Sequence, residues 1–376
     1  MKKMAVITLH RAENYGSVLQ AYAFQKTIEK LGWKVVLLDY LPERYTNKGK
    51  LNRLKYKSDK LKNPVICLIA KILIYPSYMR KNRVFKRFIS QYLHLTAKTF
   101  ATNDEAKHLK VDADIFCTGS DQVWNSHWNE GVDITLYLDF VPKGKLCFSY
   151  AASIGLSDIS QEEKQSVAKL LDKYEYISVR ENTGVEIMQD IGRDDACLTL
   201  DPTLLLEESE WNEMSGNKTC NNKYVLTYNL HHDDRIDNYA QLLAKKHSLK
   251  VRNISYNWHD IVRKGHLDWC PDVEKFLWLI KNAEYVIADS FHATVFSIVF
   301  ERQFVTITPE VASSRISSIL KILDIPERNI QEFNDTSAIE IPIAYKEVKQ
   351  LLNIERKKSI DFITKVLLTE NFTHNK

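Results

Sequence analysis

Short apolar runs alternate along the chain with longer stretches in which apolar side chains recur every three or four residues. Residues 4–9 form the first apolar run and predict a buried strand. Residues 17–31 then place their apolar side chains on one helical face, and residues 34–40 predict a second strand. Strands that alternate with helices in this way are typical of an α/β fold with parallel sheets.

The same alternation divides the chain into two parts. The pattern restarts after Asp201 and Pro202, so we predict two Rossmann-like, doubly wound domains at 1–204 and 205–340. The final segment, 341–376, contains a long charged amphipathic stretch that we expect to form a helix crossing back to the first domain. Two such domains place the expected active site in the cleft between them, at the carboxyl ends of strands. The remaining predicted elements are strands at 114–118, 146–151, 176–179, 197–200, 224–228, 249–254, 285–288 and 304–307, and helices at 161–173, 181–190, 235–246, 273–282, 291–300, 315–323 and 345–368.

Charge is distributed unevenly over these parts. The 376 residues are 44% hydrophobic and carry 52 Lys+Arg against 48 Asp+Glu, a net +4, as in globular proteins without long disordered regions. Residues 43–87 alone hold 14 bases and two acids, a charge of +12. The other 331 residues hold 38 bases and 46 acids, a charge of −8. The small total therefore hides a strongly basic insertion at 43–90.

The basic insertion contains an apolar stretch at 64–75 that is too short to span a bilayer. It is suited to lie in a membrane interface, with lysines and arginines reaching toward phosphates. We expect the insertion to bind an anionic membrane surface; a solvated helical hairpin packed on the first domain is the alternative. Nucleic acid is a poorer partner, because the segment has no recognisable binding fold and the rest of the chain is acidic.

The six cysteines and the histidines form no metal-ligand spacing. No C-x-x-C pair occurs, and the adjacent His231 and His232 would point apart on a loop, so we expect no metal. The cysteines are typical of reduced thiols. The first apolar run is interrupted by His10 and Arg11, which leaves it too short for a signal peptide, and no run reaches the ~18 apolar residues of a membrane span. We expect a cytoplasmic protein, peripheral at the inner face of the membrane.

Two strand-to-helix turns are rich in polar side chains. The first contains Asn14, Tyr15, Gly16 and Ser17, and it offers backbone N–H groups at a helix N-terminus to an anion or a sugar hydroxyl. An ordinary helix cap explains the same residues.

The second turn, residues 119–125, follows the predicted strand 114–118. Asp121 and Asn125 are candidates to hold sugar hydroxyls, and Trp124 is a candidate to stack on a sugar face. The alternative is a capped turn with a buried tryptophan.

Anion binding must use arginines or helix N-termini, because the chain has neither a G-x-G-x-x-G sequence nor a P-loop. Arg180 ends the predicted strand 176–179, where it can fork onto a carboxylate or phosphate. The alternative is a structural ion pair with Glu181, Asp190 or Asp201. His292 lies in the first turn of a predicted helix, which disfavours a protonated imidazole, whereas a bound dianion favours it. It would therefore change protonation on binding, although a lone histidine is more often structural. Arg315 is a second anion candidate.

The ordered set of motifs resembles the polysaccharide pyruvyl transferase family. The matching strings run from Ile7 to about Arg328 and read NYGSVLQAYA, GSDQVWN, SYAASIG, SVRE, DPTLL and DSFHA, followed by an arginine after a serine pair. The resemblance implies a glycosyltransferase-B-like fold. It also implies transfer of an enolpyruvyl-derived group from phosphoenolpyruvate to two hydroxyls of a sugar, such as a galactose-type residue, with formation of a cyclic pyruvate ketal and release of phosphate. Phosphoenolpyruvate is then a substrate, and no cofactor is expected.

Carried over by position, the family's S-x-R element falls on Ser178 and Arg180, and its catalytic histidine falls on His292. Members often have an Arg-Leu pair before that histidine, whereas Ser290 and Phe291 stand here. One contact to phosphoenolpyruvate must then come from another residue, such as Arg315, or phosphoenolpyruvate is held in a different way.

The resemblance gives these residues roles. His292 and Arg180 would be the catalytic residues, with His292 as the general acid. Phosphoenolpyruvate would be held by Arg180, Ser178, Ser290, His292 and Arg315. The acceptor side would consist of the remaining candidates, Asn14, Tyr15, Gly16, Asp121, Trp124 and Asn125.

The acceptor would be a lipid-diphosphate-linked sugar of a bacterial capsular polysaccharide or exopolysaccharide. A nucleotide-sugar glycosyltransferase of the same fold and a non-catalytic assembly protein remain as alternatives.

Overall fold

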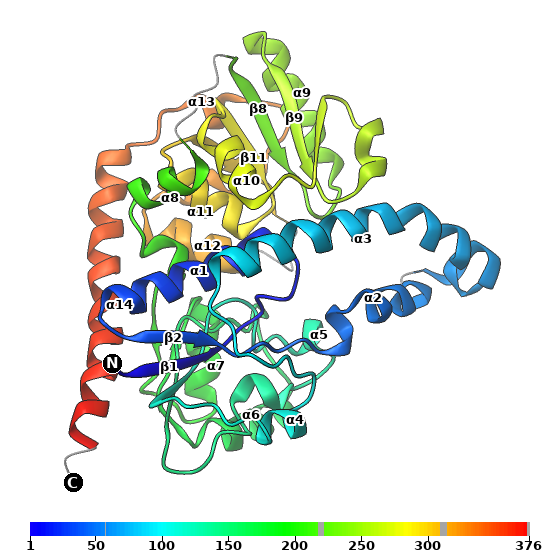
Figure 1. The fold of residues 1–376 in the computed structure, drawn as a ribbon. Coiled ribbons are helices and arrows are strands. Elements are labelled where there is room, and N and C mark those ends of the chain that lie inside the picture. The colour runs from blue at the N-terminus through cyan, green and yellow to red at the C-terminus, as the bar shows by residue number, and fades with distance from the viewer. Residues whose placement is uncertain (57, 217–221, 309–313, 374–376) are drawn as a thin grey trace.

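A computed structural model describes residues 1–56, 58–216, 222–308 and 314–373. Two five-stranded parallel sheets organise the chain (Figure 1). The first has the order β2-β1-β3-β4-β5 and the second has the order β10-β9-β8-β11-β12. Their strands are β1 Lys3–Ile7, β2 Lys34–Leu37, β3 Ile115–Thr118, β4 Leu146–Ser149, β5 Tyr174–Tyr176, β8 Tyr224–Tyr228, β9 Lys250–Ser255, β10 His266–Trp269, β11 Tyr285–Ala288 and β12 Gln303–Thr306. A separate two-stranded sheet pairs β6, Ser178–Val179, with β7, Cys197–Leu198.

Helices cover both sheets, as expected for two Rossmann-like units (Figure 1). The fold class predicted from the sequence is confirmed. The helices are α1 Tyr15–Lys30, α2 Asn47–Arg53, α3 Pro64–Tyr92, α4 Asn103–Lys107, α5 Ser126–Asn129, α6 Gln161–Leu171, α7 Asn182–Asp190, α8 Glu208–Ser215, α9 Asp234–His247, α10 Val273–Lys281, α11 Phe291–Val299, α12 Ser314–Ile322, α13 Ser337–Glu340 and α14 Tyr345–Thr373.

Helix α1 lies between the first sheet and the second domain (Figure 1). Twelve of its sixteen residues are buried, so it is covered on more than the single face that its apolar pattern predicted. Tyr15 explains part of this burial. Its ring stacks on Phe276 of α10 with centroids 4.3 Å apart, and its hydroxyl donates to the carbonyl of Pro271 at 2.6 Å. A continuous apolar cluster therefore joins the two domains.

Helix α14 runs along one edge of the molecule and contacts both domains (Figure 1). At its start, the Tyr345 hydroxyl donates to the carbonyl of Ser297 at 3.3 Å. Farther along, Ser359 Oγ accepts from the backbone N–H of Leu200 at 3.0 Å. Near its end, Thr369 lies within 2.9 Å of the Tyr176 hydroxyl. The segment 341–376 crosses between the domains as far as it is described, up to residue 373.

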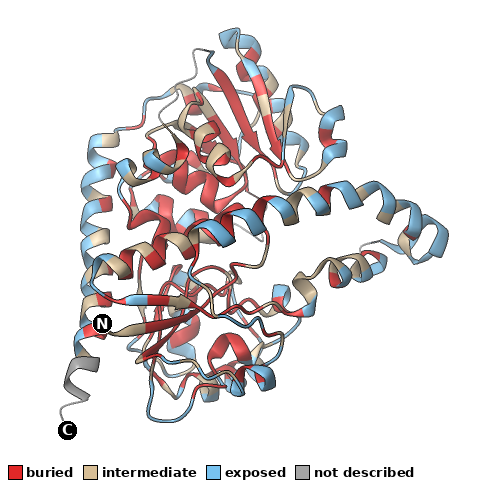
Figure 2. Ribbon diagram, in the orientation of Figure 1, coloured by how far each residue is buried: buried red, intermediate tan, exposed pale blue. Residues whose placement is uncertain are grey.

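The insertion after β2 forms an arm that projects from the body (Figures 1 and 2). Its projecting part, residues 47–79, contains α2, two short 3-10 turns and the first half of α3. The second half of α3 is anchored by four buried apolar side chains, Val84, Phe85, Phe88 and Ile89. Within the described residues, no helix is long and apolar enough to cross a membrane.

The five cysteines in the described part of the chain are free thiols. The sixth, Cys220, lies outside the described residues.

Candidate functional site

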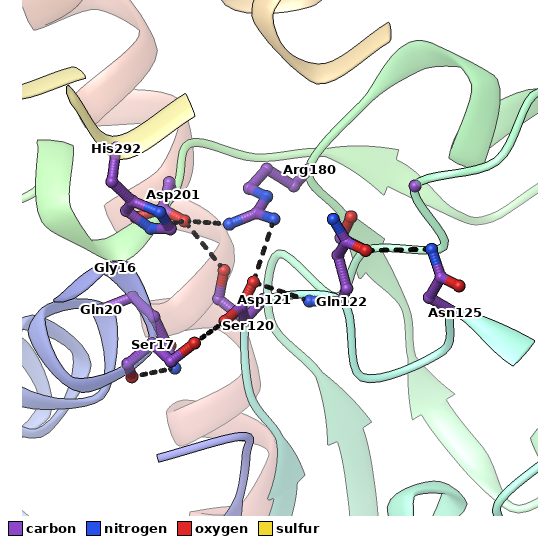
Figure 3. A network of polar contacts seen from close by, with 12 residues as sticks. Gly16, Ser17, Gln20, Ser120, Asp121, Gln122, Asn125, Arg180, Asp201 and His292 are labelled. Carbon is purple, nitrogen blue, oxygen red and sulfur yellow. Dashed lines mark hydrogen bonds and ion pairs between the residues drawn. The ribbon is translucent and has the colours of Figure 1, made fainter. Parts of the chain in front are cut away.

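Polar side chains from three loops and two helices meet where the two domains touch (Figure 3). The first domain contributes Ser120 and Asp121 after β3, Arg180 after β6 and Asp201 after β7. It also contributes the start of α1. The second domain contributes His292 from the first turn of α11.

Asp201 is the centre of this network, and its side chain is fully buried. One carboxylate oxygen accepts from Arg180 Nη1 at 2.5 Å and from Ser120 Oγ at 3.1 Å, and it lies 3.7 Å from His292 Nε2. The other oxygen accepts from the backbone N–H and the hydroxyl of Thr203. Burial alone would raise the pKa of Asp201, but His292 and Arg180 hold it well below its usual range. The carboxyl of Asp201 is therefore an anion that holds the Arg180 guanidinium and lies beside the His292 ring.

Asp121 is a second buried carboxylate in the network. It accepts from Ser17 Oγ of α1 at 2.5 Å and lies 3.5 Å from Arg180 Nη2. Burial raises its pKa, but the charges of Arg180 and His292 and the Ser17 hydrogen bond lower it overall. The backbone of Asp121 has φ +75°, an uncommon value for a residue with a Cβ. The turn thus places this carboxylate beside the arginine at a cost in backbone strain.

Arg180 is 4% exposed and is held between these two carboxylates. Burial disfavours the charged guanidinium, but Asp201 and Asp121 raise its pKa overall. Its guanidinium carbon also lies 4.6 Å from the centre of the Phe291 ring. Among the described residues, Nε and Nη2 find no hydrogen-bond partner. Arg180 therefore keeps donors that an anionic ligand would satisfy.

His292 reaches from α11 to the start of α1. Ser290 caps α11 by accepting from the backbone N–H of Ala293 at 3.5 Å, which fixes the turn that carries the imidazole. His292 Nε2 is buried and has no hydrogen-bond partner in the described part of the chain. The ring packs so closely on Gly16 that a Cβ at that position would lie 1.9 Å from Nδ1. Glycine is therefore required at residue 16 for this approach.

Arg315 in α12 adds a second guanidinium to the site. Burial and the positive charge of Arg180 lower its pKa to about 10, while Asp121 has the opposite effect. Arg180 and Arg315 thus share one region, and a bound anion would relieve their mutual repulsion. The serine before α12, Ser313, lies outside the described residues.

His231 was not among the residues selected from the sequence. Its Nδ1 lies 2.7 Å from the buried carboxylate of Asp289, and this hydrogen bond raises the pKa of His231. The charge of Arg315 acts in the opposite direction on the same imidazole. The sequence offered one signal for this contact. Asp289, the partner of His231, directly follows β11 and stands before Ser290 in the DSFHA string.

Several predicted acceptor residues are engaged within the protein instead. Asn14 caps α1 by accepting from the backbone N–H of Gly16 at 2.9 Å, and Tyr15 is fully buried between the domains. Trp124 is 2% exposed and stacks on Tyr137 with centroids 5.3 Å apart, which leaves no open face for a sugar.

Two further predicted residues also have internal partners. Asn125 is 1% exposed, accepts from the backbone N–H of Trp128 at 3.0 Å and so caps α5. On the predicted donor side, Ser178 Oγ accepts from the backbone N–H of Ala151 at 2.9 Å. The structure therefore brings together Arg180, Asp121, Arg315, Gly16 and His292, whereas Tyr15, Trp124, Asn125 and Ser178 pack around them.

No group of three potential metal ligands occurs within the described residues.

Comparisons with known proteins agree with this architecture. A family model described as polysaccharide pyruvyl transferase matches residues 14–310. A comparison with curated proteins found no match.

Solved structures similar to the chain include a UDP-N-acetylglucosamine 2-epimerase, at 9% identity and a TM-score of 0.53 over 99% of this chain and 96% of that one. The UDP-GlcNAc 2-epimerases of Neisseria meningitidis and Methanocaldococcus jannaschii are 10% and 12% identical, each with a TM-score of 0.50 over 98% of this chain and 100% of theirs. At this identity the similarity shows the fold alone, a glycosyltransferase-B-like pair of Rossmann-like domains.

Proposed function

The chain belongs to the polysaccharide pyruvyl transferase family, and on this premise we propose that it uses phosphoenolpyruvate to place a pyruvate ketal on two hydroxyls of a sugar. The acceptor in this proposal is a galactose-type sugar of a polysaccharide precursor, carried by a lipid diphosphate at the inner face of the membrane. The products are the cyclic ketal and phosphate.

One observation carries the proposal: between the two domains lie buried donors that make no hydrogen bond within the described part of the chain. Nε and Nη2 of Arg180 and Nε2 of His292 make no hydrogen bond within the described residues. Unpaired buried donors are costly, so a site that holds three of them is built for a ligand rich in acceptor oxygens. A compact trianion such as phosphoenolpyruvate satisfies them together, and Arg315 supplies further positive charge.

The chemistry begins with a proton. Addition of an alcohol to the enol carbon of phosphoenolpyruvate requires protonation of its methylene carbon, which becomes a methyl group. The first sugar hydroxyl then adds to the resulting cationic carbon and loses its proton. The second hydroxyl displaces phosphate from that carbon, and its proton leaves with the phosphate, which closes the ketal and balances the reaction.

His292 is the proton donor in this proposal. The carboxylate of Asp201 lies 3.7 Å from its Nε2, close enough to orient the imidazole. The start of α11 adds the partial positive charge of a helix N-terminus, which favours the anionic donor. Arg180, fixed by Asp201 and Asp121, holds the donor carboxylate or phosphate against this acid.

Access to the site requires a movement. Arg180 and His292 are only 4% and 6% exposed, and His292 closes onto Gly16 across the domain boundary. We expect the domains to open so that the donor can reach the arginines.

The test is incubation of the full chain with phosphoenolpyruvate and a synthetic galactoside, followed by mass spectrometry. The expected product gains the mass of pyruvate less one water. His292→Gln should lower the rate about 10²–10⁴-fold, because it removes the acid without removing the side-chain volume. His266→Gln, at an exposed histidine of the same domain, is the matched control and should leave the rate unchanged. Full activity of His292→Gln would refute the assignment.

Calorimetric titration separates this proposal from its alternatives. Heat with phosphoenolpyruvate but none with nucleotide sugars supports pyruvyl transfer. Heat with a nucleotide sugar alone would favour a glycosyltransferase, and heat with neither ligand would favour a non-catalytic assembly protein.

A further inference from the structure

The first half of α3 exposes an unusual amount of apolar surface. The arm, defined here as residues 47–79, projects from the body, and much of its surface is exposed (Figure 2). Eight large apolar side chains on α3 are 45% or more exposed, namely Val65, Ile66, Leu68, Ile69, Ile72, Leu73, Tyr75 and Met79. Monomeric soluble proteins rarely present so many neighbouring apolar side chains to water, so this surface calls for a partner.

These side chains share one side of the helix. At about 100° per residue, they fall within about half of the circumference. The opposite half holds Cys67 and Ser77, which are buried, and Ala70 and Ile74, which are half-buried. The half of the helix that faces solvent is therefore more apolar than the half that faces the protein.

The exposed charged side chains of the arm that form no ion pair within the described residues are basic. Helix α3 has no acidic residue in its 29 positions. The exposed lysines Lys48, Lys55 and Lys60 form no ion pair in the described part of the chain. Lys62, which is also exposed, pairs with Asp59 of the same turn, at 2.7 Å. The outer part of the arm is thus apolar and basic together.

We propose that the arm binds the surface of an anionic lipid bilayer, with the outward half of α3 in the interface and the lysines at the lipid phosphates. An interfacial helix combines these two features, an apolar face among acyl chains and basic side chains at the headgroups. No described helix is able to cross a membrane, so the contact is peripheral. If two arms paired with each other, the unpaired lysines of the two copies would repel one another. Helix α3 has no acidic residue that could offset this repulsion.

The arm is also firmly attached to the body. Phe85 of α3 lies against Tyr15 with ring centroids 5.2 Å apart, and Arg87 pairs with Glu274 of α10 at 2.5 Å. The indole N–H of Trp258 donates to the carbonyl of Leu73, and its backbone N–H donates to Ser77 Oγ. A bilayer bound to the arm is therefore held in a fixed relation to the site between the domains. If the proposed function holds, this favours a lipid-linked acceptor.

Vesicle co-sedimentation of the full chain tests the membrane contact. Vesicles of phosphatidylcholine and phosphatidylglycerol should sediment the protein at low salt, vesicles of phosphatidylcholine alone should sediment less, and high salt should weaken binding. Ile69→Glu should reduce partitioning at least about tenfold, because a carboxylate replaces an apolar group in the interface. Its matched control is Ile354→Glu on α14, since Ile69 is 53% and Ile354 is 52% exposed.

A second pair of variants tests the lysines. Lys60→Gln should weaken binding to the anionic vesicles about fivefold. Lys143→Gln, at an exposed lysine of the body, should leave it unchanged. Both pairs change exposed positions, and circular dichroism confirms that each variant is folded.

Three outcomes would overturn the proposal. The first is no sedimentation with anionic vesicles even at low salt. The second is equal binding by Ile69→Glu and Ile354→Glu. The third is a wild-type dimer, seen by sedimentation velocity, that Ile69→Glu converts to a monomer without any binding to vesicles; this would assign the surface to a second copy. None of these measurements depends on pyruvyl transfer, so failure here leaves the proposed function untouched.

Discussion

Replacement of Gly16 with alanine tests the contact that joins the two halves of the site. Gly16 lies in the first turn of α1, where alanine is the better helix former by about 1 kcal/mol. Helix propensity alone therefore predicts stabilisation. The structure predicts the opposite, because the new Cβ would lie 1.9 Å from Nδ1 and 2.3 Å from two ring carbons of His292. Relief of this overlap requires movement of α11 or rotation of the imidazole, at a cost of about 1–3 kcal/mol.

Activity should fall more than stability. A shift of His292 by about 1 Å moves the proposed acid away from the donor, and displacements of that size cost about 10²-fold in rate. Urea unfolding gives the stability of Gly16→Ala, and ketal formation gives its kcat. We expect a loss of stability and a lower kcat at unchanged expression.

A double-mutant cycle isolates the contact from other effects of the substitution. In a His292→Ala background the overlap is absent, so Gly16→Ala should be neutral or stabilising there. A coupling free energy near zero would refute the packing of His292 on α1. Gly184→Ala in α7 is the control glycine, because its Cβ would come no closer than 3.2 Å to a neighbouring atom.

The remaining predictions concern single residues of the network. Asp201→Asn should destabilise the protein by about 3–5 kcal/mol, because it leaves Arg180 buried between fewer negative charges. The folded-state pKa of Asp201 is depressed, so its contribution is complete above the unfolded value of about 4 and is lost as pH falls; urea titrations should show less acid destabilisation in Asp201→Asn than in wild type. Arg180→Lys should raise the KM for phosphoenolpyruvate about tenfold or more, because an ammonium cannot fork between Asp201 and a ligand. Trp124→Phe should cost about 1–3 kcal/mol through the space it leaves in the core, and it should leave the acceptor KM unchanged, since the indole is buried and its N–H has no hydrogen-bond partner among the described residues. A large rise in that KM would restore the sugar-stacking role.

The sequence was sufficient for the fold class because the buried strands are nearly continuous apolar runs, which the helical stretches separate. The prediction of individual strands was wrong in two places. The predicted strand 176–179 is divided between β5 and β6, which belong to different sheets. Strand β10 was not predicted, because none of His266–Trp269 is fully buried and two of its four residues are exposed, as suits the edge of a sheet.

The site was harder to predict than the fold for a different reason. Polar residues after a strand serve as caps or as ligand contacts, and sequence does not distinguish the two roles. Asn125 and Trp124 were proposed for a sugar, but one caps α5 and the other fills the core. Asp201 marked the end of a domain and was one of three acids that could pair with Arg180, but nothing in the sequence indicated that it also lies beside His292. Its partners Ser120 and His292 lie 81 and 91 positions away along the chain, and only the fold brings them together.

The charge of the insertion illustrates the same limit. Its +12 suggested a uniformly attractive surface, but the structure pairs several of these bases with acids of the body. Arg44 lies 2.6 Å from Asp133, and Lys50 lies 2.5 Å from Glu13. Bases fixed in this way are not available to a lipid surface, so the attraction rests on fewer lysines, near the outer end of the arm. The apolar face of α3 must then supply most of the binding free energy, and high salt should weaken the membrane contact without abolishing it.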